Sequence, residues 1–323
     1  MRPFAYAQAT SAADAVAVAG RDPSAAFLAG GTELLNLMRD GLAAPGLVVD
    51  VNAVPAKGIS FGEEVIRIGA LARMAEVARE PRVRDRLPVL SQALLAGASA
   101  QVRNAASVGG NLMQRTRCWY FRDAAMPCNT RVPGSGCPAI GGENRWHAIL
   151  GGSDACIKVH PSDLAVALTA LDATVVTHDR RIPITEFYRL PGSTPHVETA
   201  LRPGELIVAV EIPAAGAGFR SGYRKVRDRA SFEFALVSVA VSLDLDGGTV
   251  RQARIALGGV APRPWRALAA ENAVRGRRLT PDVLRAAGEA AVEGAAPREH
   301  NAFKVELVRR TVADVLERVG GGR

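Results

Sequence analysis

The chain has 323 residues, of which 48% are hydrophobic and 22% charged, values typical of a soluble globular protein long enough for two domains. The formal net charge is +8, yet the basic residues are scattered and aromatic residues make up only 5%, so we expect a solvated basic surface and no nucleic-acid binding. No stretch approaches 18 uninterrupted apolar residues and no signal-type segment follows Met1, so we expect no membrane span. We also expect folding in the cytoplasm, with export only alongside a partner that carries a signal.

Short helices and strands alternate over the first third of the chain. Ser11 is a typical helix-capping residue, and Gly41 is placed to end a later helix. The predicted helices are Ala12–Ala19, Leu34–Met38, Arg73–Arg79 and Leu87–Leu95, and the predicted strands are Ala25–Ala29, Leu47–Val51 and Val65–Ile68.

The middle of the chain loses this regularity. After a second glycine-containing turn at Ala105–Asn111, residues 114–152 show neither helical nor strand period. A loop of this length inside a compact domain is usually functional. Regular structure resumes with a helix over Ser162–Ala170 and strands over Ala173–Thr177 and Glu205–Ile212.

The last third has the pattern of a smaller α+β domain. The Ala- and Gly-rich stretch 214–218 predicts a domain joint before it. Helices stacked on one face of an antiparallel sheet are the expected architecture. The predicted strands are 223–227, 236–245 and 250–257, with a hairpin turn at 246–248, and the predicted helices are 265–274, 281–292 and 303–319.

Two glycine-containing turns have the chemistry of an anion site. Ala29-Gly30-Gly31-Thr32-Glu33 follows a strand and precedes a helix, and Ser107-Val108-Gly109-Gly110-Asn111 repeats the combination of a hydroxyl with two glycines. Adjacent glycines let the backbone approach a ligand closely, and the N–H groups at a helix start bind phosphate. Each turn alone is weak evidence, but together they could hold one diphosphate from both sides. Neither matches the Gly-x-Gly-x-x-Gly or the P-loop pattern.

The four cysteines of the chain all lie between residues 118 and 156, three of them inside the irregular segment and Cys156 just after it. Cys118, Cys128, Cys137 and Cys156 are separated by nine, eight and eighteen residues. Four thiolates suit zinc or an iron–sulfur cluster, and the wide spacings without a Cys-x-x-Cys pair favour a [4Fe–4S] cluster. Zinc, and disulfides or free thiols, stay open at this point, although no secretion signal supports disulfides.

Histidines and carboxylates add little to this interpretation. His147 lies in the cysteine segment and could sit beside a cluster, but the five histidines show no metal-ligand spacing. No Ser–His–Asp or paired-carboxylate arrangement can be defended. The residues therefore predict a redox cofactor site without a site for substrate chemistry.

The two glycine motifs, taken together, resemble those of the FAD subunit of molybdenum hydroxylases. The matching segments are Phe27–Leu34 and Gln101–Asn111, and Leu257–Pro264 is similar to the C-terminal domain of that family. The resemblance implies an α+β chain: a vanillyl-alcohol-oxidase-type FAD-binding domain of two α/β subdomains over residues 1–216, then a smaller α+β domain over 217–323. It also implies cofactor contacts by Phe27, Leu28, Ala29, Gly30, Gly31, Thr32, Glu33, Leu34, Ser107, Gly109, Gly110, Asn111, Asp163, Ile207 and Lys225.

The cysteine segment, about residues 114–157, departs from xanthine dehydrogenase. Arg115–Tyr120 and Gly134–Pro138 resemble the [4Fe–4S]-carrying flavin subunits of bacterial periplasmic aldehyde oxidoreductases. This resemblance implies metal ligation by the four cysteines. It also implies partner subunits with a molybdenum cofactor and with [2Fe–2S] clusters, and electron transfer through FAD to an external acceptor. A self-contained flavin oxidase and a zinc-stabilised binding protein without redox function are the alternatives.

Overall fold

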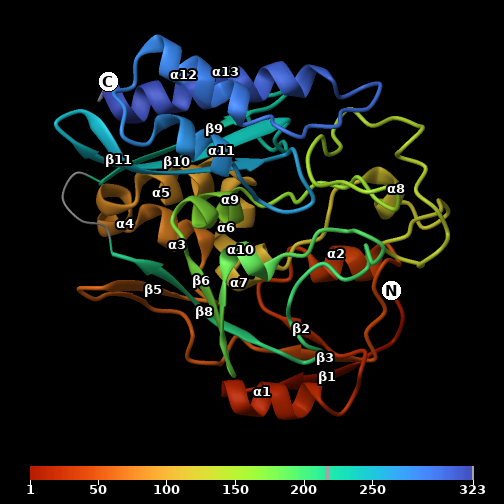
Figure 1. Cartoon of the computed structure of the whole chain (residues 1–323). Coiled ribbons are helices and arrows are strands. Elements are labelled where there is room, and N and C mark those ends of the chain that lie inside the picture. Colours follow the sequence, from red (N-terminus) through yellow and green to blue (C-terminus); the bar gives the residue numbers. More distant parts are fainter. Residues whose placement is uncertain (215–218, 322–323) are drawn as a thin grey trace.

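Three β-sheets organise the described part of the chain (Figure 1). The computed structural model describes residues 1–214 and 219–321. Two of the sheets lie in the N-terminal two-thirds of the chain, and the third lies in the C-terminal third. The predicted α+β class is therefore the observed one. The predicted joint at 214–218 falls almost entirely outside the described residues.

The first sheet is small and parallel, in the order β1-β3-β2. Its strands are β1 (Ala5–Gln8), β2 (Ala26–Leu28) and β3 (Leu47–Asp50), and parallel neighbours need crossover connections, here through α1 (Ala12–Ala19) and α2 (Leu34–Arg39). The Ser11 side chain caps α1 as predicted, accepting a hydrogen bond of 3.1 Å from the backbone N–H of Asp14. Strand β1 was not predicted, because its residues are mostly exposed and show no apolar run.

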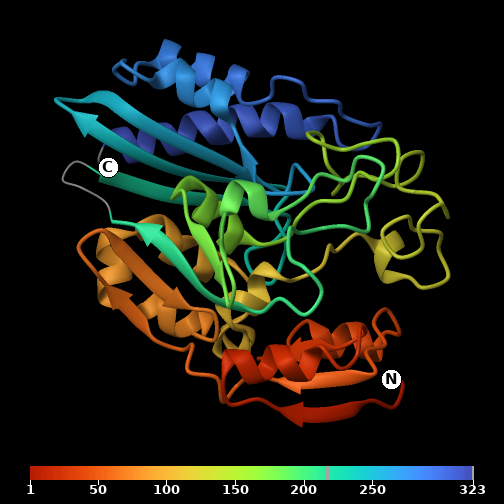
Figure 2. The same ribbon diagram turned by 60° about the horizontal axis from the view of Figure 1, so that its bottom comes forward.

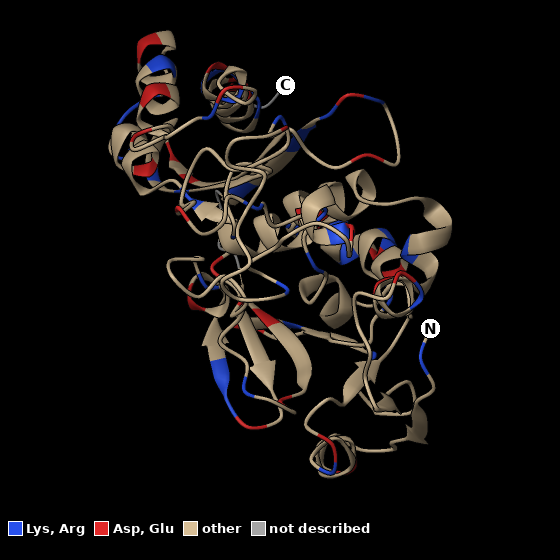
Figure 3. Ribbon diagram, turned by 90° about the vertical axis from the view of Figure 1, so that its right-hand side faces the viewer, with Lys and Arg blue, Asp and Glu red and all other residues tan. Residues whose placement is uncertain are grey.

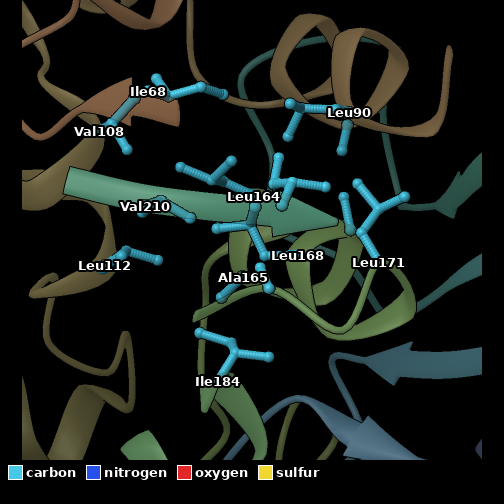
Figure 4. Packing of buried hydrophobic residues seen from close by; sticks show 14 of the residues in the cluster. Ile68, Leu90, Val108, Leu112, Leu164, Ala165, Leu168, Leu171, Ile184 and Val210 are labelled. Atoms are coloured by element: carbon cyan, nitrogen blue, oxygen red, sulfur yellow. The ribbon is translucent and has the colours of Figure 1, made fainter. Parts of the chain in front are cut away.

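The second sheet has five antiparallel strands in the order β4-β5-β8-β6-β7. Helix α9 (Asp163–Ala170) corresponds to the helix predicted over Ser162–Ala170. Ser162 caps it, and all eight residues of the helix are buried. Figure 4 shows Leu164 and Leu168 of α9 among the core residues around Val210 of β8. The other elements are β4 (Ile59–Phe61), β5 (Val65–Gly69), β6 (Thr174–Thr177), β7 (Arg181–Pro183), β8 (Ile207–Pro213), α3 (Met74–Arg79), α4 (Pro81–Arg86), α5 (Pro88–Ala96), α6 (Ala100–Ala105), α7 (Val108–Leu112) and α10 (Ile184–Phe187).

The third sheet is covered on both faces. As predicted, the helices of its own domain pack on one face, and helices of the N-terminal two-thirds cover the other. Its order is β12-β11-β10-β9, from β9 (Phe219–Val226), β10 (Val237–Asp246), β11 (Thr249–Gly258) and β12 (Trp265–Arg266). Val239 and Val241 of β10 pack into a core with α11 (Leu268–Val274), α12 (Pro281–Ala290) and α13 (Phe303–Gly321). Ala240, between them, points to the opposite face and joins the core of α5 and α9. The C-terminal sheet is therefore packed directly against the N-terminal two-thirds (Figure 2).

Two predicted elements differ from the structure for local reasons. The glycine-containing segment expected as a turn at 105–111 includes the short helix α7, which Ser107 caps. The helix expected from Trp265 begins at Leu268, because Trp265 and Arg266 pair with β11 as strand β12. The extended conformation of Trp265 and Arg266 is determined by hydrogen bonding to β11, and the local sequence carries no signal for such a long-range contact.

The cysteine segment runs beside the three sheets with little regular structure. Within residues 113–161 the only helix is α8 (Trp119–Arg122). In Figure 2 this segment lies between the N-terminal subdomain and the C-terminal domain. Backbone hydrogen bonds attach it to the C-terminal domain, from Ile149 N–H and Leu150 N–H to Val260 O at 2.9 and 3.0 Å.

Charged residues of both signs are interspersed over the fold (Figure 3). This distribution agrees with the solvated basic surface expected from the sequence. Among the helices of the described residues, none combines the length and the apolar composition needed to span a membrane.

A methyl group at Gly258 tests the contact between the two domains. Gly258 ends β11, and a Cβ there would lie 2.6 Å from Val166 Cγ2 of α9 and closer still to Ser238 Oγ. We expect Gly258→Ala to lower the free energy of unfolding by about 1–3 kcal/mol through overpacking, measured by urea denaturation. Gly58→Ala is the matched control, because a Cβ at Gly58 would meet no atom within 4 Å. Equal stability of the two variants would contradict this close packing.

Candidate functional site

The two glycine motifs lie against each other. A Cβ on Gly30 would overlap the carbonyl oxygen of Ala105, just before the second motif, so only glycine permits this approach. Arg73 reinforces the contact by donating hydrogen bonds to Ala105 O (2.7 Å) and Asn52 Oδ1 (3.0 Å). Asn52 in turn donates to the carbonyl oxygen of Ala29 at 3.0 Å. Gly30 therefore allows the two turns to pack against each other, and it would also allow a ligand to approach the backbone closely.

A pocket of about 500 Å³, called here the main pocket, lies where the two motifs meet the C-terminal domain. It brings together six of the residues that the sequence predicts to contact a cofactor. Phe232 and Phe234, in the connection between β9 and β10, also line it. The six predicted residues are Thr32, Glu33, Gly110, Asn111, Asp163 and Lys225.

The turn that borders the main pocket carries free backbone donors. Within the described residues, the N–H groups of Gly31, Thr32 and Glu33 donate to no protein acceptor. Gly31 has φ +72°, a left-handed conformation that favours glycine and turns successive N–H groups toward one side. Unpartnered amides in a concave turn fit a phosphate group.

The other predicted cofactor residues do not belong to the main-pocket lining described above. Three of them make contacts within the protein framework. The Ser107 hydroxyl accepts the N–H of Gly110 at 3.2 Å, Gly109 packs against Ala70, and Ile207 is buried in the core of the second sheet. The residues that do not line the pocket in the described structure are Phe27, Leu28, Ala29, Gly30, Gly31, Leu34, Ser107, Gly109 and Ile207.

Asp163 forms a buried polar group with two residues of β9. Lys225 Nζ lies 2.8 Å from Asp163 Oδ2, with side chains only 3% and 9% exposed, and the Tyr223 hydroxyl donates to Asp163 Oδ1 at 2.5 Å. Burial and the neighbouring carboxylate raise the pKa of Tyr223 well above its usual value. The Lys225 charge is therefore balanced by Asp163 instead of standing alone in the pocket. Tyr223 was not predicted, although its i, i+2 spacing from Lys225 places both on one face of a strand.

Glu33 joins the first glycine motif to the cysteine segment. Its carboxylate lies 2.7 Å from Arg117 Nη1 and 2.6 Å from Arg122 Nη2, and it accepts the N–H of Arg115 at 3.1 Å. All three side chains of the ion pairs are mostly buried. Arg117 and Arg122 also line the main pocket, and sequence reasoning did not select them. Arg117 directly precedes Cys118 and Arg122 follows it by four residues, and this closeness to a cysteine in a positively charged segment is the signal that could have indicated them.

The four cysteines line one small cavity, called here the cysteine cavity. All four are free thiols in the structure. Burial raises the pKa of Cys118 to about 12, while a hydrogen bond from Cys137 and the nearby Lys158 ammonium lower the pKa of Cys156 to about 6. Among the described residues no three or more His, Cys, Asp or Glu side chains are gathered in the arrangement that holds a single metal ion.

Polar neighbours surround this cavity. His147 Nε2 lies 3.1 Å from Cys118 Sγ, the position beside the cysteines that the sequence suggested. Lys158, which is 5% exposed, donates to Thr130 Oγ1 at 3.3 Å and to Glu198 Oε1 at 2.8 Å. Gly134 and Gly136 adopt φ +86° and +104°, so the reversal of the chain between Cys128 and Cys137 depends on glycine. The cavity walls are thus fixed by hydrogen bonds and turns, which suits a rigid inorganic group.

Known proteins resemble the chain along its whole length. The family described as the FAD binding domain in molybdopterin dehydrogenase matches residues 2–215, and the CO dehydrogenase flavoprotein C-terminal domain matches residues 221–319. The aldehyde oxidoreductase FAD-binding subunit PaoB of Escherichia coli strain K12 is 49% identical over 323 residues, which cover 98% of each chain.

Solved structures share the fold. Carbon monoxide dehydrogenase from Hydrogenophaga pseudoflava, in a form lacking the Mo-pyranopterin moiety, matches with a TM-score of 0.78 at 27% identity, over 99% of each chain. Quinoline 2-oxidoreductase from Pseudomonas putida 86 matches with a TM-score of 0.76 at 25% identity, over 99% of this chain and 98% of that one. This chain therefore belongs to the FAD-binding subunits of the molybdenum hydroxylase family, and it is an oxidoreductase subunit.

Proposed function

We propose that this chain carries FAD and a [4Fe–4S] cluster in a molybdenum-dependent aldehyde oxidoreductase. Electrons would come from partner subunits with a molybdenum cofactor and [2Fe–2S] clusters, pass through this chain and leave to an external acceptor. One observation carries the proposal: the main pocket joins both glycine motifs to Asp163 and Lys225, and Arg117 links it to the neighbouring cysteine segment. The aldehyde is suggested by the name of the relative from Escherichia coli, which is an FAD-binding subunit of an aldehyde oxidoreductase.

The residues of the main pocket suit FAD in two respects. The free N–H groups of Gly31, Thr32 and Glu33 can donate to phosphate oxygens, and Arg117 and Arg122 place positive charge beside them. Asp163 and Lys225 also line this pocket, and their ion pair can orient a polar ring. FAD, when bound, supplies both one-electron and two-electron chemistry, and the chain holds it and shields it from water.

The cysteine cavity supports a [4Fe–4S] cluster. Iron–sulfur clusters are held by cysteine thiolates, and here four free thiols from one segment face a single enclosed space. Lys158 can offset part of the negative charge of four thiolates and a cluster, and His147 can donate a hydrogen bond to Cys118 Sγ. Cys118 also faces a second cavity that adjoins the main pocket, so a cluster would lie close to the flavin.

Compartment and assembly follow from the same proposal. The chain would fold in the cytoplasm, where both cofactors can be inserted, and would join its partner subunits there. Any export to the periplasm would occur in the folded state, together with a partner that carries the signal.

Replacement of Cys128 by serine tests the cluster. The purified wild-type chain should show flavin bands over a broad iron–sulfur absorption and about four irons per chain. We expect Cys128→Ser to lose most of the iron and to keep its FAD, because the cysteine cavity and the main pocket are separate. Anaerobic absorption spectra with iron and zinc analysis on one sample measure this.

Different results of this experiment refute different parts of the proposal. Zinc in place of iron would refute the cluster but leave the flavin subunit. A wild-type chain without flavin bands, even after FAD is added, would refute the flavin function. An unchanged rate of flavin reduction by aldehyde in the assembled Cys128→Ser enzyme would remove the cluster from the electron path.

Replacement of Glu33 by glutamine tests the link between the two cofactor sites. Loss of the carboxylate leaves two mostly buried guanidinium groups without their partner, which should destabilise the start of the cysteine segment by about 1–3 kcal/mol. We expect faster hydrogen exchange over residues 114–122 and weaker FAD binding. Glu211→Gln is the matched control, because Glu211 also sits between two arginines, Arg67 and Arg181, but outside the main pocket. Equal exchange in both variants would contradict the link.

A further inference from the structure

One buried lysine of the C-terminal domain has no acidic partner. Three lysine side chains are at most 6% exposed, and two of them form ion pairs at 2.8 Å, Lys158 with Glu198 and Lys225 with Asp163. The third, Lys304 at the start of α13, is 0% exposed and forms no ion pair within the described residues. Burial lowers the pKa of Lys304 to about 7, so its ammonium form is held weakly unless an anion lies nearby. A negative group in its neighbourhood would remove that cost.

Lys304 and a neighbouring asparagine hold the backbone of the cysteine segment. Lys304 Nζ donates to the carbonyl oxygens of Gly259 at 2.8 Å and His147 at 3.0 Å. Asn301, also 0% exposed, donates to the same His147 carbonyl at 3.4 Å and to that of Ala148 at 3.3 Å. A neutral amide thus makes the same kind of contact, so hydrogen bonding to this backbone does not by itself require a charged side chain.

His147 connects Lys304 to the cysteines. Its Nε2 lies 3.1 Å from Cys118 Sγ, and the residue lines the cysteine cavity. It also lines a second cavity of about 200 Å³, called here the aromatic cavity because Trp119 and Trp146 stand in its wall. Lys304 belongs to neither lining in the described structure, so a single residue, His147, separates its ammonium group from the first thiol. From that position it cannot ligate iron, but its charge acts over the intervening distance.

We propose that Lys304 is the counter-charge of the proposed [4Fe–4S] cluster and raises its reduction potential. The inference rests on the proposed cluster and assigns to it a residue from outside the cysteine segment. Four thiolates give such a cluster a net negative charge, and one-electron reduction adds another. A buried ammonium group stabilises the reduced form more than the oxidised form, because the attraction grows with the charge of the cluster. The electron is the only particle that moves in this step, and no bond changes. Lys158, which lines the cysteine cavity, is balanced by Glu198.

Three variants of the assembled, FAD-loaded enzyme test this role. Lys304→Met removes the charge and the hydrogen bonds, whereas Lys304→Gln removes the charge but keeps a hydrogen-bond donor. Asn301→Leu is the matched control, because it removes hydrogen bonds to the same His147 carbonyl without changing the charge. Each enzyme is titrated with dithionite, the reduced cluster is followed by electron paramagnetic resonance, and iron is measured on the same sample.

We expect both neutral variants of Lys304 to lower the equilibrium constant for one-electron reduction roughly threefold to tenfold, which is a fall in potential of about 30–60 mV. The potential of Asn301→Leu should stay at the wild-type value, as should the iron content of all three variants. Loss of iron from both neutral variants but not from Asn301→Leu would also support the counter-charge, because the cluster would then need it to bind.

Three results would overturn the role of Lys304. One is an unchanged potential in Lys304→Met, and another is a wild-type potential in Lys304→Gln alone, which would assign the effect to hydrogen bonding. The third is an equal shift or an equal loss of iron in Asn301→Leu, since the position of the His147 backbone would then explain it. A wild-type enzyme without iron would instead refute the proposed cluster before any potential is measured.

Discussion

The carboxylate of Glu33 is the interaction on which the arrangement of the whole site depends. It belongs to the turn whose free amides border the main pocket, and it holds Arg117 and Arg122 at the start of a long segment with little regular structure of its own. Such a segment cannot position four cysteines by helix or strand geometry, so it needs side-chain contacts with a rigid neighbour. Because Cys118 directly follows Arg117, the ion pair places the first thiol relative to the glycine motif. Glu33 therefore fixes the main pocket and the cysteine segment relative to each other.

Packing between the domains fixes the other side of the pocket. Strand β10 is buried on both faces, with Val239 and Val241 toward its own helices and Ala240 toward α5 and α9. The small residue Gly258 lets α9 approach the sheet closely. This contact brings Lys225 of β9 within 2.8 Å of Asp163 at the start of α9. A buried ion pair between two domains is sensitive to their relative position, since separation would leave two charges unpaired in an apolar surrounding.

Sequence patterns predicted the residues whose chemistry is local and missed those whose role arises from tertiary contacts. Ser11 caps its helix as expected, because capping depends on a few adjacent residues. Thr32, Gly110 and Asp163 meet in one pocket, as the motifs suggested. Ile207 and Ser107, in contrast, stand in the framework, and Tyr223, Arg117 and Phe234 enter the site from segments whose position depends on long-range packing. The periodicity of the sequence does not reveal that long-range packing, so these residues could not be predicted from it.

The three cavities form a continuous series through shared walls. Asp163 and Arg117 separate the main pocket from the aromatic cavity, and Cys118 and His147 separate the aromatic cavity from the cysteine cavity. Each charged residue along the series is already paired, Arg117 with Glu33 and Lys225 with Asp163, so the walls carry little net charge toward the middle cavity. Within this cavity Trp119 and Trp146 offer aromatic surface, and a charged group would gain little there. The same pairing that orders the proposed cofactor sites therefore also leaves the cavity between them lined mainly by uncharged side chains.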